Sequence, residues 1–355
     1  MAAFRRFVLN GLPDAAFGSA DLTQAIARSV ALLATSPAAL AVALSGGPDS
    51  AMMAVHAAMY ARQNRIPLSF FHIHHGLQPV AAQWQAHVQD LARMLGVPCH
   101  CLQVKVGMST GDGIEAAARA ARYRGFVQLA GATGATHILL AHHRNDQAET
   151  VLLRLLRGAG PTGMGAMASE TRRDGLVYLR PWLDVDRAVI LAQAEKFRVQ
   201  TGWQAVQDPT NVDDKYTRAA VRERLVPELD ARWPAWRGNL ARHARLSAEA
   251  AQVLDEVAAQ DFQLLEPAPD ARSFSLVRWR TLSAARQALV LRHWLSLAGL
   301  RMPSEARLSD LMRQMRGLHA LGHDRQMRVR HGTVFICCVR GRVLLDDEPS
   351  SGQMA

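Results

Sequence analysis

The hydrophobic positions between residues 38 and 200 follow two alternating patterns. Short runs that are apolar throughout are each followed by a longer stretch in which apolar residues recur at helical spacing. The runs predict strands at 38–44, 67–73, 97–104, 137–143 and 176–182. The intervening stretches predict helices at 50–63, 81–95, 114–131, 145–157 and 184–199. Because strands of this kind are buried on both faces, the alternation predicts an α/β fold with a doubly wound parallel sheet.

The pattern changes after Trp233-Pro234. Amphipathic helices are predicted at 238–262, 281–298 and 304–316, followed by short strands in MRVRH, TVFICCV and RVLLDD. We therefore expect a second, smaller domain that is mainly helical and ends in a short β-sheet. The predicted division is a first domain at 1–235, a second at 236–346 and a tail at 347–355.

Composition narrows the class of protein. The 355 residues contain no apolar run of the about 18 residues that a membrane span requires, and the apolar segment near the N-terminus is too short for a secretion signal. Cys99 and Cys101 are one residue apart, and Cys337 and Cys338 are adjacent, which is neither a disulfide framework nor a paired Cys-x-x-Cys metal site. We expect a protein of the reducing cytoplasm with no membrane partner.

Positive charge is concentrated in one segment. The net charge is +10, and residues 232–342 hold 18 arginines and no lysine against 9 acidic side chains. Arginine suits phosphate because its planar fork matches two phosphate oxygens, so the segment indicates a polyanion partner. A general preference of the chain for arginine over lysine is an equally simple explanation of the same count.

The sequence AVALSGGPDS at 41–50 is the strongest local signal. It is an apolar strand that runs through two glycines directly into a helix. Glycine lets backbone N–H groups approach an anion, and the helix N-terminus adds unpaired N–H groups and a positive dipole end. The loop lacks the lysine of a Walker A motif and is too short for a dinucleotide-binding turn. We interpret it as a phosphate-binding loop, and a tight turn without a ligand is the alternative.

The loop SGGPDS resembles the pyrophosphate loop of the N-type ATP pyrophosphatases, the PP-loop superfamily with an adenine nucleotide α-hydrolase-like fold. Four further segments narrow the resemblance. They are FHIHHGLQ (71–78), GIEAAARAARYRGF (113–126), LLAHHRNDQAETVLLRLLRGAGPTGMGAM (139–167) and DPTNVDDKYTRAAVRERLVPEL (208–229). Together with the loop they are similar to the tRNA(Ile)-lysidine synthase family, over about residues 39 to 240.

That resemblance implies a two-step ligation that uses ATP and Mg²⁺. ATP first adenylates oxygen 2 of the first anticodon cytidine of tRNA(Ile) with a CAU anticodon, releasing pyrophosphate. The ε-amine of L-lysine then attacks carbon 2 and expels AMP, which changes decoding from methionine to isoleucine. Whether two copies of the chain form a homodimer is left open.

The resemblance and the residue chemistry together assign the site. ATP binding is assigned to Ser45, Gly46, Gly47, Pro48, Asp49, Ser50, His72 and His75. Asp146 and Glu149 are three apart on one predicted helix that follows a strand end, so they share a face. We assign Asp49 and Asp146 to the metal, and Glu149 with Asp146 to the lysine substrate. A solvated acidic face is the alternative for this pair.

Several basic residues complete the assignment. Arg119 and Arg122 are assigned as catalytic, holding a phosphate or a substrate carboxylate, with a local ion pair to Glu115 as the alternative. The residues assigned to tRNA are Arg218, Arg222, Arg242 and Arg245. His72 and His74 share a strand face and could bind a metal, although a polar pocket lining is favoured, and His142 and His143 pose the same choice.

The chain departs from the family pattern at Asn145, where two successive acids are common, and at Ala219, where asparagine is common. It is also too short for the additional C-terminal domain of some members.

Three other functions are considered. A tRNA thiolase needs a cysteine exposed at the site, for which Cys99 and Cys101 would have to serve, and an amide-forming ligase needs a source of ammonia. An RNA-binding protein with an idle nucleotide loop would bind RNA without consuming ATP.

Overall fold

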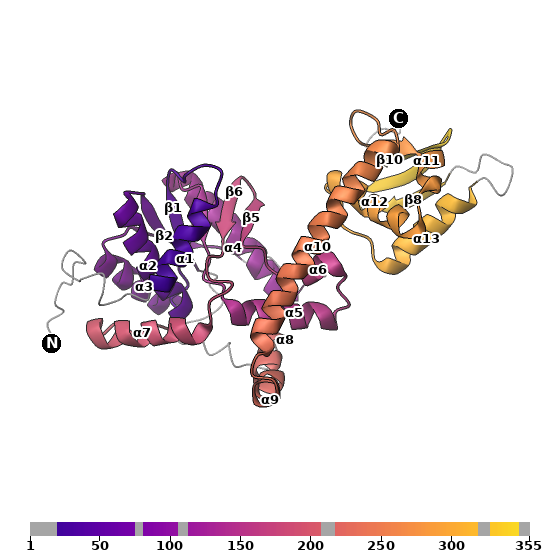
Figure 1. Ribbon diagram of the computed structural model, residues 1–355. Helices are drawn as coiled ribbons and strands as arrows, with labels where there is room; N and C mark the ends of the chain where they lie inside the picture. Colours follow the sequence, from indigo (N-terminus) through magenta and orange to yellow (C-terminus); the bar gives the residue numbers. More distant parts are fainter. Residues whose placement is uncertain (1–19, 75–80, 106–112, 207–216, 319–326, 348–355) are drawn as a thin grey trace. The chain divides into compact units, whose positions relative to one another are not determined.

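The computed structural model describes residues 20–74, 81–105, 113–206, 217–318 and 327–347. The chain divides into two compact units, Met1–Leu246 and Ser247–Ala355. In Figure 1 the first unit runs from indigo through pink to the orange beginning of α10, and the second runs from orange to yellow. The division falls inside one long helix, α10 (Trp236–Leu264), whose first residue directly follows the predicted domain boundary at 235.

A six-stranded sheet organises the first unit, with the strand order β3-β2-β1-β4-β6-β5. Its strands are β1 (Leu40–Ala43), β2 (Leu68–His74), β3 (Cys99–Gln103), β4 (His137–Leu139), β5 (Glu170–Arg173) and β6 (Leu176–Leu179). The five strands β1, β2, β3, β4 and β6 pair in parallel, which confirms the predicted doubly wound sheet. The antiparallel edge strand β5 was not predicted, because its sequence ETRR has no apolar residue.

Helices cover both faces of this sheet. The helices of the first unit are α1 (Ala20–Ala31), α2 (Pro48–Asn64), α3 (Ala81–Leu95), α4 (Gly113–Thr133), α5 (Arg144–Leu156), α6 (Pro161–Met164), α7 (Arg187–Thr201), α8 (Thr217–Ala220), the π-helical turn η3 (Val221–Leu225) and α9 (Val226–Arg232). Apolar residues of α1, α2, α3 and α7 form the core on one face with Val42. On the other face, α4 packs against Ala41 and Tyr178. Neighbouring residues of β1 thus face opposite cores, as the two-residue period of a strand requires.

The strand order reverses between β1 and β4, since β1 continues to β2 on one side and pairs with β4 on the other. In open α/β sheets, ligands bind at the carboxyl ends of the strands at this switch point. The glycine loop follows β1, and the start of α5 follows β4. The sheet therefore delivers the predicted loop and the predicted acidic pair to one place.

The second unit contains a four-stranded antiparallel sheet in the order β7-β10-β9-β8. Its elements are β7 (Ser273–Ser275), α11 (Leu276–Thr281), α12 (Ala284–Leu297), α13 (Glu305–Gly317), β8 (Arg328–His331), β9 (Val334–Val339) and β10 (Arg342–Asp347). Phe274, Trp279 and Trp294 lie in its core. The mainly helical domain with a short sheet is confirmed, and the three-residue strand β7 is an addition. Among the described residues, no helix is long and apolar enough to cross a membrane.

Candidate active site

The loop between β1 and α2 is tied together by one serine. Ser50 Oγ accepts the backbone N–H groups of Ser45 and Gly46, both at 3.2 Å, and donates to the carbonyl of Gly47 at 3.0 Å. Gly46 has φ +97°, and a Cβ there would lie 3.2 Å from a methyl group of Val88, so glycine is required on both counts. The N-cap of α2 is Gly47, which has no side chain to cap the helix. The first N–H groups of α2 are thus available to an anion.

Asp49, in the first turn of α2, is held by groups from outside the loop. Its carboxylate accepts hydrogen bonds from Arg187 Nε at 3.3 Å and Nη2 at 3.2 Å, and lies 3.7 Å from His143 Nε2. Burial alone raises the pKa of Asp49, but the interactions with His143 and Arg187 outweigh burial, so the pKa lies below its usual value. The carboxylate therefore stays charged at the N-terminus of α2, where the helix dipole favours a negative charge.

His143 joins Asp49 to Asp146. It is the N-cap of α5, and its Nδ1 accepts the backbone N–H of Asp146 at 3.3 Å. Asp146 Oδ2 in turn accepts the backbone N–H of His143 at 3.1 Å, which completes a capping box. The ring Nε2 lies 3.5 Å from Asp146 Oδ2. Two carboxylates from different strand ends thus meet at one imidazole.

Glu149 lies on the same face of α5 as Asp146 and is paired with two arginines. Arg218 Nε donates to Glu149 Oε2 at 2.8 Å, and Arg222 donates to both carboxylate oxygens, from Nε at 2.8 Å and Nη2 at 2.9 Å. Arg222 Nη2 also lies 3.3 Å from Asp146 Oδ1. Only 6% of the Glu149 side chain is exposed, so the alternative of a solvated acidic face is wrong.

Arg218 and Arg222 belong to a helical segment that was not predicted. Arg218 lies in α8, and Arg222 lies in the π-helical turn η3 that follows it. Burial alone lowers the pKa of Arg222, but Glu149, Asp146 and Asp49 outweigh burial and raise it. Two of the four residues assigned to tRNA, Arg218 and Arg222, therefore occupy one cluster with both residues assigned to lysine, Glu149 and Asp146. Ala219, one of the two departures from the family pattern, lies between Arg218 and Arg222 in the sequence, and its side chain is buried.

Arg119 and Arg122 lie on α4, together with Tyr123. Arg119 Nη2 donates to the Tyr123 hydroxyl at 3.2 Å, and its guanidinium lies 5.2 Å from the ring centre. Arg122 keeps exposed surface, yet the protein atoms packed round its guanidinium lower its pKa, and the neighbouring charge of Arg119 lowers it further. The side chain of Glu115 lies outside the described residues, so the alternative of an ion pair with it stays untested.

His142, two residues before the start of α5, is influenced by the charges of Arg119 on α4 and of Asp146 on α5. Its Nδ1 is buried and has no hydrogen-bond partner among the described residues. Burial lowers the pKa of His142 to about 4, and the charges of Arg180, Arg119 and Arg218 act in the same direction, against Asp146. His142 is therefore a neutral imidazole with an unused polar atom.

The remaining assigned residues are placed as follows. His72 is buried at the end of β2, and its Nδ1 lies 2.8 Å from the carbonyl of Leu44, so it braces the start of the glycine loop. His75 lies outside the described residues. Arg242 and Arg245 lie on α10 and line a separate pocket with Arg144. The sequence indicated His143 only as a possible metal ligand or pocket lining, and its position between two carboxylates as the N-cap of α5 was not predicted. Arg187 was not predicted at all, because no sequence pattern links it to Asp49.

The donors for a metal are carboxylates. Among the described residues, no group of three or more His, Cys, Asp or Glu side chains is arranged to hold a metal ion, which leaves the metal reading of His72 and His74 without support. Asp49 and Asp146 are two oxygen donors next to a phosphate loop. Mg²⁺ is bound through one or two carboxylates plus phosphates and water, so these residues fit that ion.

Comparison with known families covers both units. The family model described as PP-loop domain matches residues 20–229. The model described as TilS substrate binding domain matches residues 274–344. The first match contains the glycine loop, α5 and the arginines of α8 and η3, and the second contains the C-terminal sheet from β7 onward.

Individual relatives agree with the family models. A tRNA(Ile)-lysidine synthase of Bordetella bronchiseptica is 59% identical over 92% of this chain and 95% of its own length. Another, from Polaromonas naphthalenivorans, is 38% identical over 89% of this chain and 93% of its own length. Among solved structures, the U34-tRNA thiolase NcsA from Methanococcus maripaludis with its [4Fe-4S] cluster superposes with a TM-score of 0.52 at 14% identity, over 64% of this chain and 78% of that one, which shows a shared fold alone. This chain belongs to the tRNA(Ile)-lysidine synthase family of PP-loop proteins.

Proposed function

We propose that the chain joins L-lysine to carbon 2 of the first anticodon cytidine of tRNA(Ile) bearing a CAU anticodon. As a member of its family, it is an ATP-dependent ligase that modifies tRNA. The observation that carries the proposal is the meeting of two carboxylates at His143. Asp49 comes from the phosphate loop after β1, and Asp146 comes from the helix after β4. Phosphate binding and carboxylate chemistry therefore share one site.

In the first step, oxygen 2 of the cytidine attacks the α-phosphorus of ATP, and the bond to pyrophosphate breaks. The N–H groups at the start of α2 and the hydroxyl of Ser45 bind the phosphates and stabilise the departing charge. Ser50, whose hydroxyl proton goes to the carbonyl of Gly47, holds the loop in this conformation. His72 is assigned to the nucleotide, together with His75, which lies outside the described residues. Mg²⁺, bound by Asp49 and Asp146, would neutralise phosphate charge at this step.

In the second step, the lysine ammonium group gives one proton to solvent water, the resulting ε-amine attacks carbon 2, and the bond from carbon 2 to the oxygen of AMP breaks, so that AMP leaves with the bonding electrons. Glu149, with Asp146, holds the lysine ammonium group. A carboxylate can accept about four hydrogen bonds. Arg218 and Arg222 donate three to Glu149. The remaining acceptor position, on Oε1, would accept from the ammonium group, and the two arginines hold the carboxylate in place. Arg119 and Arg122 bind the carboxylate of lysine or a phosphate.

The two parts of the chain divide the work. Residues 1–235 carry the catalytic site, and residues 236–346 bind tRNA, a division that the family match at 274–344 supports. A protein whose partner is tRNA works where tRNA is found, in the cytoplasm.

The test is pyrophosphate release from ATP with Mg²⁺, comparing a tRNA(Ile) transcript with a CAU anticodon and the same transcript with another first base. Release that requires the cytidine, and a lysidine product that requires lysine, are expected. Release independent of cytidine would indicate another adenylating tRNA enzyme. RNA binding with no release at all would indicate an RNA-binding protein with an idle loop.

A further inference from the structure

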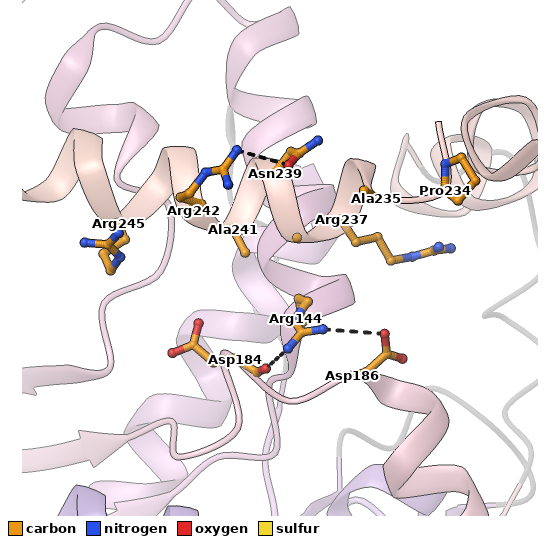
Figure 2. A pocket seen from close by; sticks show the side chains of 11 residues that line it. Arg144, Asp184, Asp186, Pro234, Ala235, Arg237, Asn239, Ala241, Arg242 and Arg245 are labelled. Atoms are coloured by element: carbon orange, nitrogen blue, oxygen red, sulfur yellow. Dashed lines mark hydrogen bonds and ion pairs between the residues drawn. The ribbon is translucent and has the colours of Figure 1, made fainter. Parts of the chain in front are cut away.

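A polar pocket of about 570 Å³ lies in the first unit, next to the N-terminal turns of α10. Its charged lining consists of four arginines and two aspartates: Arg144, Arg237, Arg242, Arg245, Asp184 and Asp186. Figure 2 shows α10 running along one side of the pocket, with Arg144 of α5 across from it between the two aspartates. Arginines outnumber aspartates, so the lining favours an anion.

The arginines differ in how they are partnered. Arg237 is neutralised, because it forms two ion-pair contacts with Asp230 and its guanidinium lies 4.7 Å from the centre of the Trp236 ring. Arg242 donates to the amide oxygen of Asn239 at 3.2 Å, and a neutral amide does not cancel its charge. Arg144 donates to the backbone carbonyl of Asp184 and lies 3.7 Å from the Asp186 carboxylate. Arg242 therefore provides an uncancelled positive charge on one side of the pocket, and Arg144 faces it from the other side with a looser ion pair, at 3.7 Å, to Asp186.

The pocket shares two chain segments with the candidate active site. Arg144 comes two residues before Asp146, and its backbone N–H donates to the carbonyl of Val185 at 2.9 Å. Asp186 comes one residue before Arg187, which binds Asp49. The backbone N–H of Arg187 also donates to the side chain of Asn145 at 3.4 Å. The pocket residue Arg144 thus follows His143, which contacts Asp146. The pocket residue Asp186 precedes Arg187, which contacts Asp49.

We propose that this pocket binds one phosphodiester of the RNA strand that carries the reacting nucleotide, with Arg144 and Arg242 donating to its oxygens. The inference rests on the proposed function for the identity of the RNA. Guanidinium groups bind phosphate oxygens through a pair of parallel N–H groups, and phosphate contacts fix the register of a nucleic acid without reading its sequence. A phosphate held here positions the neighbouring nucleotide at the site. The two aspartates disfavour the denser charge of free ATP or pyrophosphate, so the pocket suits a singly charged phosphodiester.

The first test is the affinity for a tRNA(Ile) transcript, measured without ATP or lysine across a salt titration. Arg242→Gln is expected to weaken binding about 10-fold at low salt and to reduce the slope of log K against log salt by about 0.7 to 0.9, the share of one phosphate contact. Arg93→Gln removes the same charge from a side chain that is 76% exposed on α3, and it should change neither quantity. Equal slopes for Arg242→Gln and the unchanged protein would overturn the proposal.

A variant that is expected to bind the transcript more tightly provides a test that misfolding cannot mimic, because a misfolded variant would lose affinity. Asp186 is the N-cap of α7, and its side chain accepts the backbone N–H of Ala188 at 2.9 Å. Asparagine keeps that acceptor but removes the negative charge from the pocket. Asp186→Asn should therefore bind the transcript several-fold more tightly. Unchanged or weaker binding by this correctly folded variant would contradict the assignment of the pocket to a phosphate.

A single-atom test identifies which ligand occupies the pocket. Neutral methylphosphonate linkages are placed one at a time along the anticodon arm, and each transcript is titrated against the unchanged protein and Arg242→Gln. One linkage should weaken binding to the unchanged protein about 10-fold but have little added effect in the variant, as coupled partners do. Fully additive losses at every linkage would overturn the proposal, as would a loss of pyrophosphate affinity in Arg242→Gln with unchanged tRNA affinity. Because these experiments measure binding alone, failure of lysine ligation would be seen separately.

Discussion

Arg187 binds Asp49 through two nitrogens, with Nε at 3.3 Å and Nη2 at 3.2 Å from the carboxylate oxygens. The two residues are 138 positions apart in the sequence. Asp49 begins α2 behind the glycine loop, whereas Arg187 begins α7 behind the segment that follows β6. The contact therefore holds the carboxylate of Asp49 on α2 against α7, a helix that follows a different strand of the sheet.

Loss of Arg187 should shift the pH dependence of the first reaction step. Burial raises the pKa of Asp49, and in Arg187→Gln only His143 remains to oppose burial, so the pKa should rise. Because the charged carboxylate is the active form, the acid side of the pH profile of pyrophosphate release should move to higher pH. Arg198→Gln lies on the same helix and loses only an exposed pair with Glu195, so its profile should match that of the unchanged protein. Superimposable profiles for both variants would contradict the role of Arg187.

Removal of the Asp49 charge should stop adenylation itself. Asp49→Asn keeps the size of the side chain but removes the negative charge assigned to the metal. We expect pyrophosphate release to fall by about 100-fold or more, the usual effect of losing one electrostatic contact at a reacting centre. Asp90→Asn, a half-exposed position on α3, provides the matched control. Pyrophosphate release at the unchanged rate in Asp49→Asn would contradict the role assigned to Asp49 in adenylation.

Replacement of Glu149 should separate the two steps. Glu149→Ala removes the group assigned to the lysine ammonium but leaves the phosphate loop intact. Adenylated tRNA should therefore accumulate while lysidine falls, which is measured by chromatography of the digested tRNA. The variant also leaves Arg218 and Arg222 without their shared partner, so we expect a loss of unfolding free energy of about 3 kcal/mol. Normal lysidine formation in this variant would eliminate the assignment.

The sequence predicted those parts of the site that follow from local chemistry. The strand β1, the glycine loop and α2 are contiguous, and their apolar run, glycines and helical spacing lie within residues 40–64. By contrast, Arg218 and Arg222 reach Glu149 across 69 and 73 positions, and no periodic pattern encodes such a pairing. The assignment of both arginines to tRNA stays a prediction. Their pairing with a buried carboxylate is revealed only by three-dimensional proximity.

Secondary structure was missed where local patterns are weak. The edge strand β5 has the sequence ETRR, which carries no hydrophobic signal because one side of an edge strand faces solvent. The turns α8, η3 and α9 are each short. Conversely, the strand predicted at 137–143 ends at Leu139, since His143 is needed as the N-cap of α5. The apolar run continues past the strand because Leu140 is buried in the core against α4.

Gly46 should tolerate no side chain. Gly46→Ala would force an L-residue to φ +97° and place its Cβ 3.2 Å from Val88 Cγ1. We expect a loss of about 1–3 kcal/mol of unfolding free energy, the usual cost of such a strained backbone, together with weaker ATP binding. Gly131→Ala is the control, because it lies in α4 with nothing within 4 Å of the added Cβ. That variant should gain about 0.5–1 kcal/mol. Equal ATP affinity in Gly46→Ala would show that the loop conformation does not depend on glycine.

His56 should make the stability of the first unit depend on pH. It is buried on α2, its Nδ1 lies 2.8 Å from the Thr23 hydroxyl, and burial lowers its pKa from 6.5 to about 4. Between those values the unfolded chain binds a proton that the folded chain does not, so unfolding free energy falls as pH falls. One such group contributes a slope of up to about 1.4 kcal/mol per pH unit. His56→Gln removes that proton and should flatten the curve between pH 6.5 and 4 by about this amount, measured by urea unfolding. An unchanged slope in His56→Gln would mean that the buried ring accepts its proton without unfolding.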